Sequence, residues 1–332
     1  MSAVLFSKEL TIRDVWKAKK NIQGIVQKTP LVFSPVLSEK CGASIYLKCE
    51  HLHQTGSFKL RGATNMINSL SSEEKARGVT TFSTGNHGLA VAYAAKQLGI
   101  RAVICVSTRV PKAKSEAILK MGAELEIYGD GQDDAEKRCY ELHYQEGLTI
   151  IPPFDHPLII GGQGTMALEI LEELPDVNGV IGGLSGGGLL SGVGVTMKQS
   201  DPSIKIIGVT MEKGAAMHAS IASGQPVEVK EFHTLADSLL GGIGVDNQYT
   251  FPLVKKYVDD YVLIPESTIA KGMALLYEQH RMIVEGAAAI GVGALIDGLV
   301  KPPGDTTVVI LSGNNVDLDS HIESIKLHVP IF

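Results

Sequence analysis

The sequence predicts an α/β fold of two lobes, each built on an open, mostly parallel sheet flanked by helices. Short strands alternate with helical segments along most of the chain, as in parallel sheets that are covered on both faces. This alternation occurs in two series, one beginning at Val79 and the other after Pro153. The chain has 332 residues, long enough for two lobes, and its 36 glycines fit many tight turns between strand and helix.

The first part of the chain is divided by periodicity and by turn residues. Thr11 and Asp14 form a capping pair for a helix over 11–27, which Pro30 ends. A strand over 43–48 leads into a stretch that contains a lysine and then into a helix. The predicted helices are 58–69, 89–98, 111–121 and 133–146, and the strands of the first series are 79–83, 102–106 and 124–128.

The second series begins where the chain returns to the first lobe, at Pro152–Phe154 and the pair Gly161–Gly162. Gly162–Ala167 matches the dinucleotide pattern GxGxxA, but the acidic residue expected about 20 positions later is missing. We interpret this stretch as a turn that opens a helix. The helices are expected at 164–174, 189–198, 266–280 and 285–299, and the strands at 179–181, 205–209 and 306–311. The expected domains are 1–77 with 156–332 (large) and 78–155 (small and mobile).

Composition excludes several classes of partner. Thirty basic and thirty-six acidic residues give a charge of −6, and no basic tract indicates nucleic-acid binding. No run approaches the ~18 apolar residues of a membrane helix, and the first residues lack a long apolar core and a cleavage site, so we expect no signal peptide there. The four cysteines form no CxxC pair and no zinc spacing, so we expect reduced thiols in a cytoplasmic protein.

One lysine stands out by its neighbours. The stretch Gln54–Ala63 places Lys59 between turn-forming and hydroxyl residues, directly after Phe58. A lysine can form a Schiff base with an aldehyde where its surroundings favour the neutral amine. Most lysines are exposed and inert, and an exposed surface lysine is the alternative for this stretch.

A glycine loop, Ser185–Leu189, lies between a predicted strand and a predicted helix. Successive backbone N–H groups and the positive end of a helix suit a phosphate group. The loop is not a Walker A sequence, because no Gly-Lys-Ser/Thr follows. A tight turn that binds nothing is the alternative.

Two further polar turns follow strands. Ser83–His87 stands between a strand and a helix, a position that suits a carboxylate, and Asn86 adds a donor. Ser312–Asn315 ends the last strand, at the edge of the sheet where such folds bind ligands. Taken singly, a capped helix with a solvent-facing histidine and a small polar turn explain these two stretches as well.

Together these stretches resemble the serine/threonine dehydratase and serine racemase branch of the fold-type II pyridoxal-phosphate enzymes. The likeness covers nearly the whole chain and is carried by Lys48–Glu50, Gln54–Ala63, Ser83–Gly88, Ser185–Leu189 and Ser312–Asn315. It implies a two-lobed fold like that of the tryptophan synthase β subunit, a homodimer, and a small amino-acid substrate.

The resemblance also implies a role for each stretch. Lys59 would bind pyridoxal 5'-phosphate as a Schiff base and later act as the base at Cα, with Thr84 on the opposite ring face. The implied cofactor-binding residues are Phe58, Lys59, Asn86, Ser185, Gly186, Gly187, Gly188, Leu189 and Ser312. The implied substrate-binding residues are Ser83, Thr84, Gly85 and His87.

The implied reaction converts a β-hydroxy amino acid (threonine, serine or 3-hydroxyaspartate) to a 2-oxo acid and ammonia through an aminoacrylate. A second hypothesis is an amino-acid racemase, of serine or aspartate type, that uses Lys59 and Thr84. A third, of another class, is a non-catalytic amino-acid-binding protein of the same fold.

Three further comparisons with the branch concern its metal site, the size of the substrate and a glutamate near the cofactor. The two acidic residues of its usual divalent-cation site are replaced by Thr210 and Ala216, so we expect no such metal site. Thr234–Gly244 and Met211–Met217 are similar to the hydroxyectoine-utilisation dehydratases, which implies a larger hydroxylated substrate. Glu285 matches a family glutamate near the cofactor, with a structural or a catalytic role.

Overall fold

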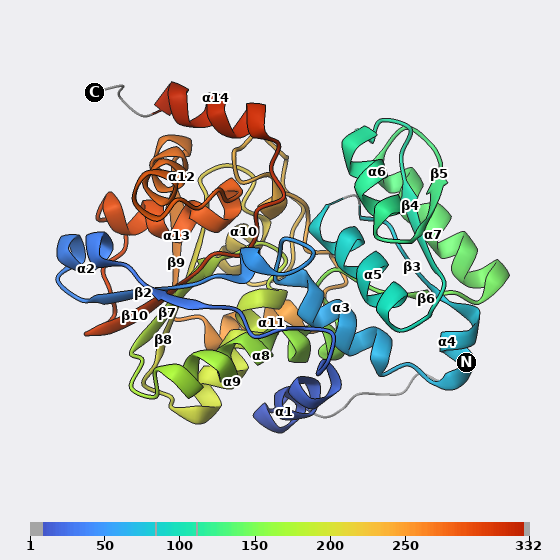
Figure 1. The fold of residues 1–332 in the computed structure, drawn as a ribbon, viewed down its shortest axis with the longest axis horizontal. Helices are drawn as coiled ribbons and strands as arrows, with labels where there is room; N and C mark the ends of the chain where they lie inside the picture. The colour runs from blue at the N-terminus through green and yellow to red at the C-terminus, as the bar shows by residue number, and fades with distance from the viewer. Residues whose placement is uncertain (1–8, 84, 111, 329–332) are drawn as a thin grey trace.

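The computed structural model describes residues 9–83, 85–110 and 112–328. Within these residues the strands form two sheets, which lie apart in the view of Figure 1 with helices around each. The α/β class and the mostly parallel sheets, predicted from the alternation of strands and helices, are confirmed. No helix in the described ranges is long and apolar enough to span a bilayer.

The six-stranded sheet has the order β1-β2-β10-β7-β8-β9, and β1 is antiparallel to β2 while the other pairs are parallel. Strand β10 is parallel to β2 on one side and to β7 on the other. The carboxyl ends of these three strands therefore lie at the same edge of the sheet. The strands are β1 (Leu31–Phe33), β2 (Ser44–Lys48), β7 (Gly179–Gly183), β8 (Lys205–Met211), β9 (Asp260–Ile264) and β10 (Thr306–Ile310).

Helices cover both faces of this sheet, and an apolar core fills the space beneath each layer. On one side lie α1 (Ile12–Asn21), α8 (Pro157–Glu173), α9 (Gly188–Ser200), α10 (Ala216–Ser223) and α11 (Thr250–Tyr257). On the other lie α2 (Pro35–Cys41), α12 (Glu266–His280), α13 (Gly286–Ile296) and α14 (Leu318–His328), as Figure 1 shows. The predicted capping pair of α1 is confirmed, because Asp14 Oδ2 accepts from Thr11 N at 3.1 Å.

The four-stranded sheet has the order β5-β4-β3-β6, and all its pairs are parallel. Its strands are β3 (Val79–Thr81), β4 (Ala102–Val106), β5 (Glu124–Ile127) and β6 (Thr149–Ile150). It is covered by α5 (Asn86–Gln97), α6 (Lys112–Lys120) and α7 (Gln132–Glu146), with α4 (Ser72–Arg77) leading into β3. Helix α3 (Lys59–Asn68) packs against both α5 and α8 and so joins the two groups of elements.

Several predicted boundaries differ from the structure, and two of the differences have a clear physical cause. The helix expected over 11–27 ends at Asn21, before Gly24 turns the chain with a φ of 83°. The turn expected at Gly161–Gly162 and the helix opening at 162–167 lie inside α8. A Cβ at Gly162 would stand 2.6 Å from Cα of Gly62. The glycines of this stretch therefore serve close helix packing and not a turn.

Candidate active site

A cavity of about 1190 Å³ is lined by the segments that follow the carboxyl ends of strands from both sheets. It brings together all the predicted site residues that the structure describes. They are Phe58, Lys59, Ser83, Gly85, Asn86, His87, Ser185, Gly186, Gly187, Gly188, Leu189 and Ser312. Thr84, predicted as a second catalytic and substrate-binding residue, lies outside the described residues.

Lys59 is the first residue of α3, and its amine faces a backbone oxygen. Its Nζ donates to the carbonyl oxygen of Pro153 at 2.8 Å and lies 5.3 Å from the ring centre of Phe58. Removal from water lowers the pKa of Lys59 to about 8, against the opposing charge of Glu285. About a tenth of the amine is then neutral at pH 7, far more than for a lysine of ordinary pKa, which favours Schiff-base formation.

The stretch before Lys59 is fixed against the end of β10. Phe58 N donates to the Ser312 carbonyl oxygen at 3.0 Å, and Ser57 pairs with Gly313 in an isolated bridge. Gly56 has a φ of 71°, and a Cβ there would stand 2.8 Å from the side-chain oxygen of Asn315. These contacts bring Lys59 and Ser312 to one side of the cavity.

The glycine loop leads from β7 into α9, and Gly187 caps that helix with a φ of 87°. A Cβ at Gly187 would lie 2.8 Å from Met217 and Val254, and one at Gly186 would lie 2.5 Å from the ring of Phe154. The first N–H groups of a helix have no acceptor within it. A loop without side chains before such donors fits a phosphate group.

Helix α5 presents a second set of free helical donors at the cavity, beginning at Asn86. Ser83 Oγ accepts from Gly85 N at 3.4 Å, so this turn is closed by its own hydroxyl. His87 is buried in the first turn, and its Nε2 donates to the carbonyl oxygen of Ile151 at 2.9 Å. The arrangement suits a carboxylate at the backbone, as the sequence predicts for this turn.

Asn86 belongs to a buried network that sequence reasoning found only in part. Its Nδ2 donates to both carboxylate oxygens of Glu285, each at 3.0 Å, and its Oδ1 accepts from Asn315. Ser238 Oγ also donates to Glu285, at 2.9 Å. Burial raises the pKa of Glu285 above its ordinary value. The family likeness signalled Glu285, whereas nothing local in the sequence pointed to Ser238 or Asn315 as members of this network.

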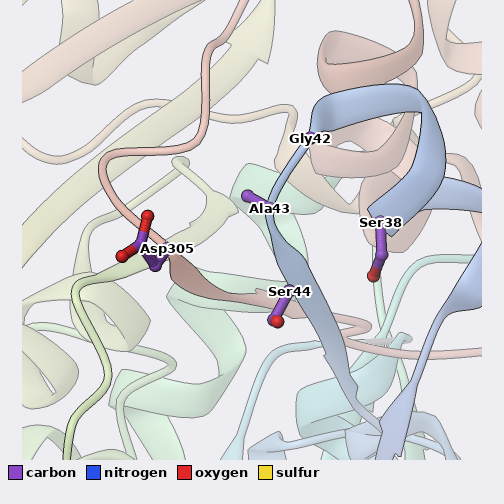
Figure 2. Close-up of a pocket in the computed structure, with 5 residues that line it drawn as sticks. All are labelled: Ser38, Gly42, Ala43, Ser44 and Asp305. Carbon is purple, nitrogen blue, oxygen red and sulfur yellow. The ribbon is translucent and has the colours of Figure 1, made fainter.

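A second hollow, of about 430 Å³, lies at the opposite end of the six-stranded sheet (Figure 2). It is formed by the turn Gly42–Ser44 before β2, by Ser38 and by Asp305 before β10. The Ser38 hydroxyl is already bonded to Ser34 O and Ile45 N. This hollow has no group that compares with Lys59.

The positions that correspond to the usual cation ligands of the branch hold side chains that are not acidic. Thr210 and Ala216 are buried and Glu212 is exposed. Over the described part of the chain, no group of three His, Cys, Asp or Glu side chains is placed to hold a metal ion.

The fold and the cavity together define a class of enzyme. A lysine of lowered pKa shares one cavity with a glycine loop at one helix start and the polar start of another. Such a site can bind a phosphorylated aldehyde through a Schiff base.

Comparison with known proteins agrees with this class. The family described as pyridoxal-phosphate dependent enzyme matches residues 22–313, and the chain belongs to this family. It is 50% identical over 317 residues to a putative threonine dehydratase of Sinorhizobium fredii, covering 96% of each chain. It is 41% identical over 311 residues to L-threonine ammonia-lyase of Thermotoga maritima, covering 93% of this chain and 77% of that one.

A solved structure extends the likeness to the fold. Maize serine racemase matches with a TM-score of 0.90 and 32% identity, covering 97% of this chain and 98% of the other. The predicted branch of fold-type II pyridoxal-phosphate enzymes is therefore confirmed, and pyridoxal phosphate is the cofactor of the family. The narrower likeness to the hydroxyectoine-utilisation dehydratases stays a prediction.

Proposed function

We propose that this protein is an ammonia-lyase that converts a β-hydroxy amino acid to a 2-oxo acid and ammonia. The observation that carries the proposal is the amine of Lys59, of lowered pKa, in one cavity with the glycine loop and the start of α5. The relatives named threonine dehydratase and L-threonine ammonia-lyase support the same reaction.

The residues of the cavity fit the cofactor. Lys59 would hold it through a Schiff base, and the loop Ser185–Leu189 would hold its phosphate. Ser312 would face the ring nitrogen, Phe58 would pack beside the ring, and Asn86 would bond the 3-hydroxyl oxygen. One amide hydrogen of Asn86, shared between the two carboxylate oxygens of Glu285, would make both contacts, and the other would be left for this bond. Bound pyridoxal phosphate makes the α-proton of an amino acid acidic by delocalising the negative charge.

The chain's own groups then position the substrate and move its proton. Ser83, Gly85 and the free N–H groups of α5, including that of His87, would receive the carboxylate. We propose that Thr84 also binds the substrate carboxylate. The Lys59 amine would be the base that removes the α-proton, since its lowered pKa keeps part of it neutral.

The bonds balance as a β-elimination followed by hydrolysis. The Cα–H and Cβ–O bonds break, a C=C bond forms, and the proton and hydroxide leave as water. The released enamine tautomerises to an imine, takes up water, and yields the 2-oxo acid and ammonia.

The assembly and the domains belong to the same proposal. We propose that the protein is a homodimer. We also propose that it is cytoplasmic, because four free cysteines suit a reducing compartment. The small domain, 78–155, is proposed to close over the substrate, because the cavity is lined from both sheets. Analytical ultracentrifugation of the holoenzyme tests the dimer.

A panel of β-hydroxy amino acids tests the reaction. With bound cofactor, we expect equal yields of 2-oxo acid and ammonia from at least one of L-threonine, L-serine and 3-hydroxyaspartate. Exchange of enantiomers without ammonia would instead identify the racemase. If the protein binds pyridoxal phosphate and changes none of these substrates, the non-catalytic binding protein is the correct reading.

A further inference from the structure

Asn86 lies within a chain of hydrogen bonds whose two ends can only accept. At one end, Asn315 Nδ2 donates to the carbonyl oxygen of Thr55 at 2.9 Å, and the same nitrogen donates to Asn86 Oδ1. At the other end, Asn86 Nδ2 lies 3.0 Å from each carboxylate oxygen of Glu285. A carbonyl and a carboxylate both require a donor, so the orientation of the two amides between them is fixed.

The carboxylate of Glu285 accepts from several donors. Besides Asn86, it accepts from Ser238 Oγ at 2.9 Å and from the backbone N–H of Asn315. The backbone N of Glu285 donates to the carbonyl oxygen of Gly313 at 3.1 Å, and the residue is only 4% exposed. Burial raises the pKa of Glu285, and the donors oppose this shift. Glu285 is therefore an acceptor held in place next to the end of β10.

The chain of hydrogen bonds joins the two groups of elements at the cavity. Asn86 is the first residue of α5, which covers the four-stranded sheet, and Glu285 directly precedes α13, which covers the six-stranded sheet. Asn86, Glu285 and Ser238 all line the cavity. The start of α5 is therefore bonded to side chains that come from the other lobe.

One amide hydrogen of Asn86 is left for a bound group. The two hydrogens of an amide diverge widely, whereas the two oxygens of one carboxylate, equally distant from Nδ2, lie in nearly the same direction. One hydrogen is then shared between both oxygens of Glu285. Within the described residues Asn86 Nδ2 has no acceptor other than Glu285, so its second hydrogen is free to donate.

We propose that Glu285 is a positioning residue, which acts through Asn86 and, with Asn315, keeps an amide hydrogen directed to the 3-hydroxyl oxygen of the bound cofactor. The inference rests on the proposed function, which places the cofactor here, and deepens it. A donor at this oxygen favours its ionised form, so the proton stays on the Schiff-base nitrogen. An amide turned the other way would present its oxygen and favour the un-ionised hydroxyl.

The absorbance of the bound cofactor reports where this proton lies. The form with the proton on the Schiff-base nitrogen absorbs visible light, and the form with the proton on the oxygen absorbs in the near ultraviolet. The measured quantity is the ratio of the visible band to the near-ultraviolet band. It is measured in protein saturated with pyridoxal phosphate and without substrate, so it does not depend on turnover.

Two substitutions of Glu285 separate positioning from charge. Glu285→Gln removes the charge and keeps an oxygen that can accept from Asn86, while its amide nitrogen can donate to Ser238 Oγ. Glu285→Leu removes the charge and every acceptor. We expect Glu285→Gln to keep the wild-type band ratio and Glu285→Leu to lower it by about three-fold or more. An equal fall in both variants, or no fall in Glu285→Leu, overturns the proposal.

A double-mutant cycle tests whether Glu285 acts through Asn86. In an Asn86→Ala background, Glu285→Leu should add no further change to the band ratio. The same fall in both backgrounds would identify a direct effect of Glu285 on the cofactor and overturn the positioning role.

Asn315→Ala decides the case where Glu285→Leu does not fold or bind cofactor. It removes the donor that holds Asn86 Oδ1. A fall of the band ratio supports the proposal, and an unchanged ratio overturns it. Wild-type holoenzyme that converts none of the β-hydroxy amino acids contradicts the proposed function itself and leaves the band ratio measurable. The two failures are therefore distinct.

Discussion

Lys59 Nζ donates to the carbonyl oxygen of Pro153 at 2.8 Å, although Pro153 belongs to the segment that joins the two sheets. The same segment contacts two other parts of the cavity. The ring of Phe154 packs against Gly186, and Asp155 accepts from the backbone N–H groups of Gln248, Tyr249 and Thr250 at the start of α11. The amine is thus held where the glycine loop and the connection between the sheets meet.

The pKa of Lys59 predicts how cofactor uptake depends on pH. Only the neutral amine attacks an aldehyde, and the pKa is about 8 in place of 10.5. The rate at which cofactor-free protein binds pyridoxal phosphate should rise with pH and level off above pH 8. Stopped-flow absorbance measures this rate. In Glu285→Gln the midpoint should move lower, because Glu285 opposes the shift. A rate that keeps rising to pH 10 contradicts the prediction.

Gly187→Ala should weaken cofactor binding. The φ of 87° costs a residue with a Cβ roughly 1–2 kcal/mol, and the added carbon would press on Met217 and Val254. We expect the Kd for pyridoxal phosphate to rise by about ten-fold or more. Gly24→Ala is the control, since Gly24 has a φ of 83° but is exposed with open space around it. It should lose some stability and keep its affinity, and equal affinity loss in both variants would refute the role of the loop.

A buried charge cluster beneath the first turn of α3 predicts a large effect on stability. Arg61 is fully buried and donates to Glu50 at 2.6 and 2.8 Å and to Glu169 at the same two distances. Burial works against ionisation, but Arg61 and His53 hold the pKa of Glu50 well below its ordinary value. Lys48 Nζ donates to Glu169 as well, at 2.6 Å.

Arg61→Leu leaves two buried carboxylates short of their partner, so we expect a loss on the order of 3–5 kcal/mol in the free energy of unfolding. Arg101→Leu, which removes exposed ion pairs with Glu124 and Glu146, should cost about 1 kcal/mol or less. Urea unfolding at pH 7 compares them. The deficit of Arg61→Leu should shrink as the pH falls, because the two carboxyls then become protonated. Equal losses in the two variants would contradict the cluster's importance.

The sequence predicted the elements that local pattern controls. The bounds of β4 and α12 were predicted to the residue, because a short apolar run marks the strand and a proline directly precedes the helix. The family resemblance implied that Lys59, the glycine loop and Ser312 bind one cofactor, and the strand order β2-β10-β7 brings the three to one edge of the sheet.

What the sequence could not give depends on contacts far apart in the chain. The sequence pattern indicates a turn at Gly162, because its partner, Gly62, lies a hundred residues away and only the packing of α3 on α8 reveals it. The bond from Lys59 to Pro153 and the amide of Asn86 between Glu285 and Asn315 have the same origin. The tautomer of His87 follows from a single backbone carbonyl, at Ile151. No local pattern encodes these pairs.

The central claim is that Lys59 forms the Schiff base with the cofactor, and borohydride reduction tests it most directly. Purified protein saturated with pyridoxal phosphate is reduced, digested and mapped by mass spectrometry. We expect one modified peptide, with the pyridoxyl group on Lys59, and no visible Schiff-base absorbance in Lys59→Ala. Label on another lysine, or unchanged absorbance and labelling in Lys59→Ala, would contradict the account.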